Sequence, residues 1–231
     1  MQALNPPLRD WRGKRVWLVG AASGIGLALA DALIAAGARV AVSARREALL
    51  QQHFEGRAVV LALDVTDAAA TQTAAQQLQQ QWQGIDLVMA LAGDYLPMSV
   101  QELDLPRSQQ IVAVNLQGVL NLLAAVKDRL LAQGSGHFSI VASVAGYGGL
   151  PNSLAYGASK AGAINLAQSL WLELRAAGIG VSVINPGFVA TPLTAGNNFP
   201  MPFLISTEQA VQQILRGLAR GEFEIHFQIG R

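Results

Sequence analysis

Residues 14–26 have the sequence KRVWLVGAASGIG, a short apolar run that leads into three glycines with the spacing G-x-x-x-G-x-G. Residues 14–20 predict a buried strand, and the Ala/Leu-rich residues 25–36 predict a helix with Gly37 at its C-terminal cap. A glycine-rich turn between a strand and a helix is typical of a site for the phosphates of a dinucleotide. The alternative is a turn with a purely structural role; the flanking strand and helix favour the phosphate site.

The three glycines have separate physical roles in such a turn. Gly20 permits a tight turn with positive φ. Gly24 lets the backbone approach a pyrophosphate, and Gly26 lets the helix pack close to the sheet. Because the helix begins near Ile25, its free N–H groups are expected to face the phosphates, and the Ser23 hydroxyl can add a donor.

The rest of the chain repeats this alternation of apolar runs and helical stretches. Further strands are predicted at 39–44, 58–63, 85–91, 137–142, 180–184 and 222–227. Further helices are predicted at 47–53, 67–82, 107–131, 152–177 and 207–220, with a loop at 186–206. Continuous apolar strands that alternate with helices indicate a parallel sheet covered on both faces. We therefore expect one α/β domain over residues 1–231, a Rossmann-type doubly wound sheet of about seven strands, which binds ligands at the carboxyl ends of its strands.

Composition excludes several classes of function. The chain has 231 residues, of which 52% are hydrophobic, and its net charge is only +1, so neither nucleic acid nor an anionic membrane surface is an expected partner. It has no cysteine, which excludes disulfides and thiolate chemistry, and its three histidines are far apart, so no metal site is expected. No apolar run reaches the roughly 18 residues of a membrane span, and no secretory signal is visible, which predicts a cytoplasmic protein.

The end of the second predicted strand bears on cofactor choice. An acidic residue there would bind the adenosine ribose of NAD, but the chain has Ala44 followed by Arg45 and Arg46. A guanidinium pairs well with a phosphate, so the pattern favours NADP(H) over NAD(H), although both arginines could also be solvated. Asp64 and Val65, after the third strand, are placed to meet an adenine; the alternative for Asp64 is a helix cap.

A second motif carries acid–base chemistry. Tyr156 and Lys160 lie four residues apart in a predicted helix, so phenol and ammonium share one helical face. A nearby ammonium favours the phenolate and would lower the pKa of Tyr156, which suits the phenol to proton exchange with a carbonyl or carbinol oxygen. Ser143, just past the fifth strand, can hydrogen-bond the same oxygen.

With these motifs in this order, the chain resembles the short-chain dehydrogenase/reductase family in its compact form, over about residues 13–228. Asn115, in the sequence VNLQG at 114–118, matches the family's catalytic asparagine. Ser143, Tyr156 and Lys160 match the rest of its tetrad, and residues 185–191 (NPGFVAT) match the segment that cradles the nicotinamide. The predicted cofactor-binding residues are Gly20, Ser23, Gly24, Ile25, Gly26, Arg45, Arg46, Asp64, Val65, Ala92, Gly93, Tyr156, Lys160, Pro186, Gly187, Val189 and Thr191.

The resemblance implies a mechanism and an assembly. Tyr156 serves as general acid or base, Ser143 polarises the substrate oxygen, and Asn115 holds a water in a proton relay from Lys160. The two long helices, 107–131 and 152–177, pair between subunits in the family, which implies a homodimer or homotetramer. Three positions depart from the family pattern: Val19, Ala90 and Leu91 stand where the family has Thr and two Asn.

The substrate pocket is expected after the fourth, fifth and sixth strands. Its candidate residues are mostly apolar or aromatic: Asp94, Tyr95, Ala145, Tyr147, Leu150, Leu193, Phe199 and Phe203, with the loop at about 187–206. The leading hypothesis is an NADP-dependent oxidoreductase for a small, mostly apolar carbonyl or alcohol. The alternatives are a 3-oxoacyl thioester reductase, an epimerase or dehydratase of nucleotide sugars, and a non-catalytic NADP(H) sensor, which would bind the cofactor without turnover.

Overall fold

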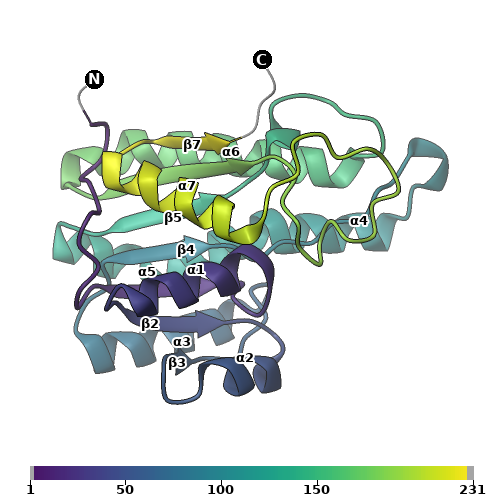
Figure 1. The fold of residues 1–231 in the computed structure, drawn as a ribbon. Coiled ribbons are helices and arrows are strands. Elements are labelled where there is room, and N and C mark those ends of the chain that lie inside the picture. Colours follow the sequence, from purple (N-terminus) through teal and green to yellow (C-terminus); the bar gives the residue numbers. More distant parts are fainter. Residues whose placement is uncertain (1–2, 228–231) are drawn as a thin grey trace.

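The computed structural model describes residues 3–227. Within them, seven parallel strands form one sheet (Figure 1). The strands are β1 (Arg15–Val19), β2 (Arg39–Ser43), β3 (Val59–Val60), β4 (Leu87–Ala90), β5 (His137–Val141), β6 (Gly180–Pro186) and β7 (Glu224–Phe227). Their order across the sheet is β3-β2-β1-β4-β5-β6-β7, so the chain reverses direction across the sheet between β1 and β4. The predicted Rossmann-type α/β domain is confirmed; its outermost residues, 1–2 and 228–231, lie outside the described part.

Helices cover both faces of the sheet (Figure 1). They are α1 (Gly24–Ala35), α2 (Glu47–Phe54), α3 (Ala68–Trp82), α4 (Leu105–Val112), α5 (Gly118–Gln133), α6 (Leu154–Leu174) and α7 (Thr207–Arg220). Apolar side chains of α1, α2 and α7 pack on one face, and those of α3, α5 and α6 pack on the other. Because β1 and β4 are buried on both faces, their sequences are continuous apolar runs rather than alternating ones.

The third strand is shorter than the predicted 58–63. Only Val59 and Val60 pair with β2, at the edge of the sheet. Beyond them the chain still follows β2, since the N–H of Leu61 donates to the carbonyl of Val42 at 3.0 Å. The chain then turns at Asp64, whose side chain accepts two hydrogen bonds from Thr66.

The predicted helix 107–131 is interrupted. Residues Ala113–Gln117 form a π-helix, η2, between α4 and α5. The whole stretch Leu105–Gln133 is long and apolar enough to cross a membrane by length and composition, so the expectation that no apolar segment reaches that length is wrong. Here its apolar side packs against the sheet. A π-turn holds one residue more than an α-turn and is common at functional sites. In this protein the π-turn contains Asn115.

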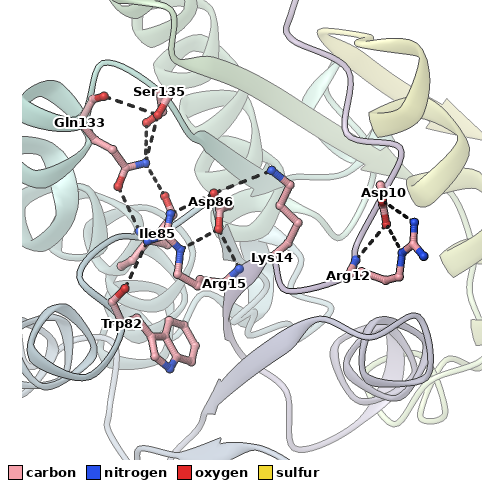
Figure 2. Close-up of polar contacts among 9 residues, drawn as sticks. All are labelled: Asp10, Arg12, Lys14, Arg15, Trp82, Ile85, Asp86, Gln133 and Ser135. Carbon is pink, nitrogen blue, oxygen red and sulfur yellow. Dashed lines mark hydrogen bonds and ion pairs between the residues drawn. The ribbon is translucent and has the colours of Figure 1, made fainter.

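A polar clamp ties β1 to β4 at the end of the sheet opposite to the glycine turn (Figure 2). The backbone N–H and Nε of Arg15 both donate to Oδ2 of Asp86 at 2.8 Å, and its Nη2 donates to Oδ1 at 3.1 Å. Gln133, at the end of α5, holds the neighbouring loop through both backbone groups of Ile85. The two strands that flank the reversal are therefore fixed at their amino ends.

His137 is a buried titratable residue at the start of β5. Its Nε2 lies 2.8 Å from Oγ of Ser182, which itself donates to the carbonyl of Glu222 at 2.9 Å. Nε2 must therefore carry the proton, and within the described residues Nδ1 has no partner. Burial lowers the pKa of His137 to about 4, so the imidazole is neutral in the folded protein at pH 7.

Candidate active site

A cavity of about 720 Å³ lies at the carboxyl ends of the strands, beside the reversal between β1 and β4. That volume falls within the usual range for small-molecule sites. Its walls come from the loops after β1 to β6 and from the start of α6. The predicted site residues that line it are Gly20, Ser23, Gly24, Ile25, Gly26, Arg45, Arg46, Asp64, Val65, Ala92, Gly93, Ser143, Tyr156, Lys160, Pro186, Gly187, Val189, Thr191 and Leu193.

The glycine turn has no room for a side chain at Gly20 or at Gly26. Gly20 has φ +110°, and a Cβ there would lie 2.3 Å from the amide nitrogen of Ala92. A Cβ on Gly26 would lie 2.3 Å from the carbonyl oxygen of Gly20. Ser23 makes no side-chain hydrogen bond to the first turn of α1, so its hydroxyl and the N–H groups of that turn remain available to a ligand. The cradle fits a pyrophosphate.

The loop after β2 brings two cations to the cavity. Ser43 is fixed by the indole of Trp17, whose Nε1 donates to its Oγ at 2.9 Å. Ala44, Arg45 and Arg46 follow and line the cavity. Neither guanidinium takes part in an ion pair within residues 3–227. This wall therefore offers free positive charge and no carboxylate.

The turn after β3 shows that Asp64 is not a helix cap. Oδ1 of Asp64 accepts from the N–H of Thr66 at 2.9 Å and from its hydroxyl at 2.8 Å, which closes the turn locally. The cap of α3 is instead Asp67, which accepts from the N–H of Ala70 at 2.9 Å. Asp64 thus lines the cavity and does not cap a helix.

Ser143, Tyr156 and Lys160 meet on one wall of the cavity. Ser143 follows β5 and is fixed by the N–H of Ala145, which donates to its Oγ at 3.1 Å. Tyr156 and Lys160 project from the first turns of α6, as their spacing predicts. Nζ of Lys160 donates to the carbonyl of Val141 at 2.9 Å, so the last residue of β5 positions the ammonium.

The electrostatics of this cluster correct one expectation. Burial raises the pKa of Tyr156, and the hydrogen bond with Ser143 opposes that rise. Nζ of Lys160 lies 5.8 Å from the centre of the Tyr156 ring and donates to the carbonyl of Val141. Burial also lowers the pKa of Lys160 to about 8. The pair therefore sits in a desolvated site in which an added charge would act strongly.

The side chain of Asn115 is fully engaged. Its Oδ1 accepts from the N–H of Asp94 at 2.8 Å, and its Nδ2 donates to the carbonyl of Asp94 at 2.9 Å and to Oγ of Ser159 at 3.0 Å. It is 1% exposed and does not line the cavity. A water relay at Asn115 would therefore have to use its backbone, within the π-helix.

The departures from the family pattern leave the central strands joined by backbone. The N–H groups of Leu91 and Ala92 both donate to the carbonyl of Val19, at 2.7 and 2.8 Å. The loop after β6 is also held internally, because Oγ1 of Thr194 donates to the carbonyl of Val189 at 2.6 Å. Thr194 lines the cavity and was not predicted; its position three residues after Thr191 was the only signal.

Of the eight substrate candidates, seven are not among the described residues that line the cavity, Phe199 and Phe203 included. Ala145 is buried, Leu150 is exposed, and neither lines it; Tyr147 turns away to hydrogen-bond Glu224 and Asn185. Burial, with a further contribution from Glu224, raises the pKa of Tyr147 to about 12. The cavity therefore does not support Ala145, Tyr147 and Leu150 as substrate contacts, whereas Leu193 lines it.

Tyr95 packs against Tyr156 instead. Its ring meets the ring of Tyr156 edge-on, with centroids 4.8 Å apart and an interplanar angle of 68°. Its neighbour Asp94 pairs with the guanidinium of Arg107 on α4, and no spacing in the sequence pointed to that pair. Among the described residues no group of acidic or histidine side chains could hold a metal ion.

Comparison with known proteins identifies the chain's relatives. The family profile described as short chain dehydrogenase matches residues 14–200. An uncharacterized oxidoreductase of Myxococcus xanthus is 39% identical over 216 residues, covering 91% of this chain and 85% of that protein. One of Staphylococcus epidermidis is 34% identical over 185 residues, covering 79% and 80%.

Solved structures agree in fold. A short-chain type dehydrogenase/reductase from Mycobacterium marinum has a TM-score of 0.85 at 26% identity, with 95% of each chain covered. One from Burkholderia phymatum, in complex with NAD, has a TM-score of 0.87 at 21% identity, with 95% and 90% covered. The match over most of its length shows that this chain belongs to the short-chain dehydrogenase/reductase family.

Proposed function

We propose that this oxidoreductase transfers a hydride between NADP(H) and a small, mostly apolar carbonyl or alcohol substrate. One observation carries the proposal: a single cavity joins the free cations Arg45 and Arg46 at one end to Ser143, Tyr156 and Lys160 at the other. Cations suit a phosphate, and a hydroxyl beside a buried phenol suits a carbonyl oxygen. The glycine turn between them fits the pyrophosphate that would connect the two ends.

In this proposal the protein binds the substrate oxygen and moves one proton. The Ser143 hydroxyl donates to the substrate oxygen, and Tyr156 gives its phenolic proton to that oxygen in reduction or accepts one in oxidation. Lys160, held by Val141, supplies positive charge that favours the phenolate. The nicotinamide, when bound, supplies the hydride in reduction and accepts it in oxidation, and Pro186, Gly187, Val189 and Thr191 are the residues we propose to hold it.

The choice of NADP(H) is tested by Arg45→Ala. The side chain lost is the one proposed to bind the 2′-phosphate, and a charge-assisted hydrogen bond of this kind corresponds to roughly a 10- to 100-fold change in affinity. We expect the Kd of NADPH to rise by that factor in a fluorescence titration, while the Kd of NADH changes little. Arg57→Ala, outside the cavity, is the control. Equal losses for both cofactors would contradict a phosphate contact.

Tyr95 is proposed as the wall that keeps the Tyr156 ring in place. An edge-to-face contact is worth about 0.5–1.5 kcal/mol, so Tyr95→Ala should lower kcat/KM by roughly 2- to 10-fold. Tyr95→Phe keeps the ring and should retain activity. Steady-state kinetics on both variants decide the matter, because equal loss in the two would assign the effect to the hydroxyl.

The class of reaction is tested by cofactor titration followed by a panel of ketones and aldehydes, with absorbance of the reduced nicotinamide as the readout. Turnover of simple carbonyls supports the proposal. Turnover confined to 3-oxoacyl thioesters would favour that alternative, and tight binding with no turnover of either would favour a sensor.

We propose a homodimer or homotetramer as the assembly and the cytoplasm as the compartment. The outer sides of the long helices support the assembly, since Val112, Leu120 and Leu172 are apolar and exposed there. Light scattering of the purified protein tests it, and a monomer at micromolar concentration would contradict it.

A further inference from the structure

The turn at residues 64–66 lies beyond the end of β3 and is closed by the hydrogen bonds that Thr66 donates to Asp64. Before it, the N–H of Leu63 donates to the carbonyl of Ala44, one residue past β2, at 3.2 Å. Asp64 and Val65 line the cavity at the end where the proposed function puts the adenine. The hydrogen bonds within the turn set its shape, and a contact with another element fixes its place relative to the cavity.

Asn121, on the second turn of α5, provides that contact. Its Nδ2 donates to the carbonyl of Val65 at 2.9 Å and to that of Thr66 at 3.3 Å. The side chain is 9% exposed, so little water competes for these bonds. Nε2 of Gln117 donates to Oδ1 of Asn121 at 3.1 Å, which fixes the orientation of the amide.

Gly118 shows how closely this helix approaches the turn. A Cβ at Gly118 would lie 2.6 Å from Cγ1 of Val65. The side chain of Val65 therefore packs directly on the backbone of α5, one turn before Asn121. Packing fixes the side of Val65 that faces the helix, and Asn121 fixes its carbonyl.

We infer that Asn121 is a positioning residue for the adenine end of the cofactor site. The inference rests on the proposed function, because it assigns the adenine to Asp64 and Val65. Asn121 is not itself among the residues that line the cavity and acts through the backbone of the turn. Loss of its amide would let the turn relax and would weaken binding of the adenosine half alone.

The experiment compares Asn121→Leu with Gln133→Leu. Both remove an amide of α5 that holds a neighbouring loop by its backbone, but Gln133 does so at the opposite end of the sheet (Figure 2). ADP-ribose probes the adenosine half, and reduced nicotinamide mononucleotide, used as hydride donor, probes the other. We expect Asn121→Leu to raise the Kd of ADP-ribose and of NADPH about 10-fold, with the KM for the mononucleotide unchanged. Gln133→Leu should leave all three unchanged.

A milder variant covers the case in which Asn121→Leu fails to fold. Gln117 is exposed, so Gln117→Ala should fold and raise the Kd of ADP-ribose by about 2- to 3-fold, because the Asn121 amide loses its orientation. Wild-type affinity in both Asn121→Leu and Gln117→Ala, or an equal loss in Gln133→Leu, overturns the inference and leaves the proposed function standing. Failure of the wild-type protein to bind NADPH, NADH or ADP-ribose overturns both.

Discussion

Tyr156→Phe should abolish turnover while the protein still binds NADPH. The substitution removes only the phenolic oxygen, which lies on the cavity wall beside Ser143. General acid–base catalysis contributes on the order of 100- to 10,000-fold, so we expect kcat to fall about 1,000-fold. The ring remains to pack against Tyr95, and the phosphate-binding turn is untouched. The Kd of NADPH should therefore stay within about 2-fold of wild type by fluorescence titration.

Tyr147→Phe is the matched control for that result. Tyr147 lies close to Ser143 in sequence, but its hydroxyl hydrogen-bonds Glu224 and Asn185 and is turned away from the cavity. It should keep most of its activity. If Tyr156→Phe retained substantial activity, or if both variants lost it equally, the acid–base role of Tyr156 would be wrong.

Acid should destabilise the protein between pH 6.5 and pH 4 through His137. The unfolded imidazole titrates near 6.5, whereas burial lowers the folded pKa to about 4. As pH falls through this window, the imidazole binds a proton in the unfolded state but stays neutral in the folded state. The free energy of unfolding therefore declines, and the loss is complete below pH 4. A shift of this size corresponds to about 3 kcal/mol of free energy of unfolding. Urea unfolding followed by tryptophan fluorescence at pH 7.0, 5.5 and 4.5 (chosen to span the window) measures it.

His137→Gln separates this effect from other titrations. Glutamine keeps an amide donor for Ser182 but has no proton to gain, so its stability should vary less with pH than that of wild type. His226→Gln, the same substitution at an exposed histidine, is the control. The paired carboxylates Asp86 and Asp94 act at lower pH: burial raises their pKa values, but hydrogen bonds from Arg15 and Arg107 outweigh it and hold both pKa values below the ordinary range. Parallel curves for wild type and His137→Gln would refute the assignment.

Sequence predicted those features that depend on local spacing. The glycines of the first turn, and Tyr156 with Lys160 four residues apart, are fixed by one strand, one turn and one helix each, so position in the sequence determines position in space. The order of the apolar runs likewise predicted the parallel sheet. The assignment of residues to the cofactor remains a proposal.

What sequence could not predict depends on contacts between distant segments. Burial raises the pKa of Tyr156 and the hydrogen bond with Ser143 opposes that rise, and neither effect follows from the spacing of Tyr156 and Lys160. Tyr147 was expected at the substrate because it follows Ser143, but Glu224, 77 residues away in the sequence, draws it to the other side. The role of Asn121 could not be predicted from the sequence, because its partner Val65 lies 56 residues earlier.

The π-helix at Ala113–Gln117 has a consequence for how this enzyme can change over evolution. Its extra residue is absorbed within the turn, so the helices before and after it keep nearly the register of one continuous α-helix. Deleting one residue there would restore regular α-helical bonding and leave Asn121 close to its present orientation. The change would fall on Asn115, whose amide holds both backbone groups of Asp94 from within the π-turn. Homologues can therefore gain or lose this single residue without rebuilding the rest of the fold, and those that lose it should also lose the contact between Asn115 and Asp94.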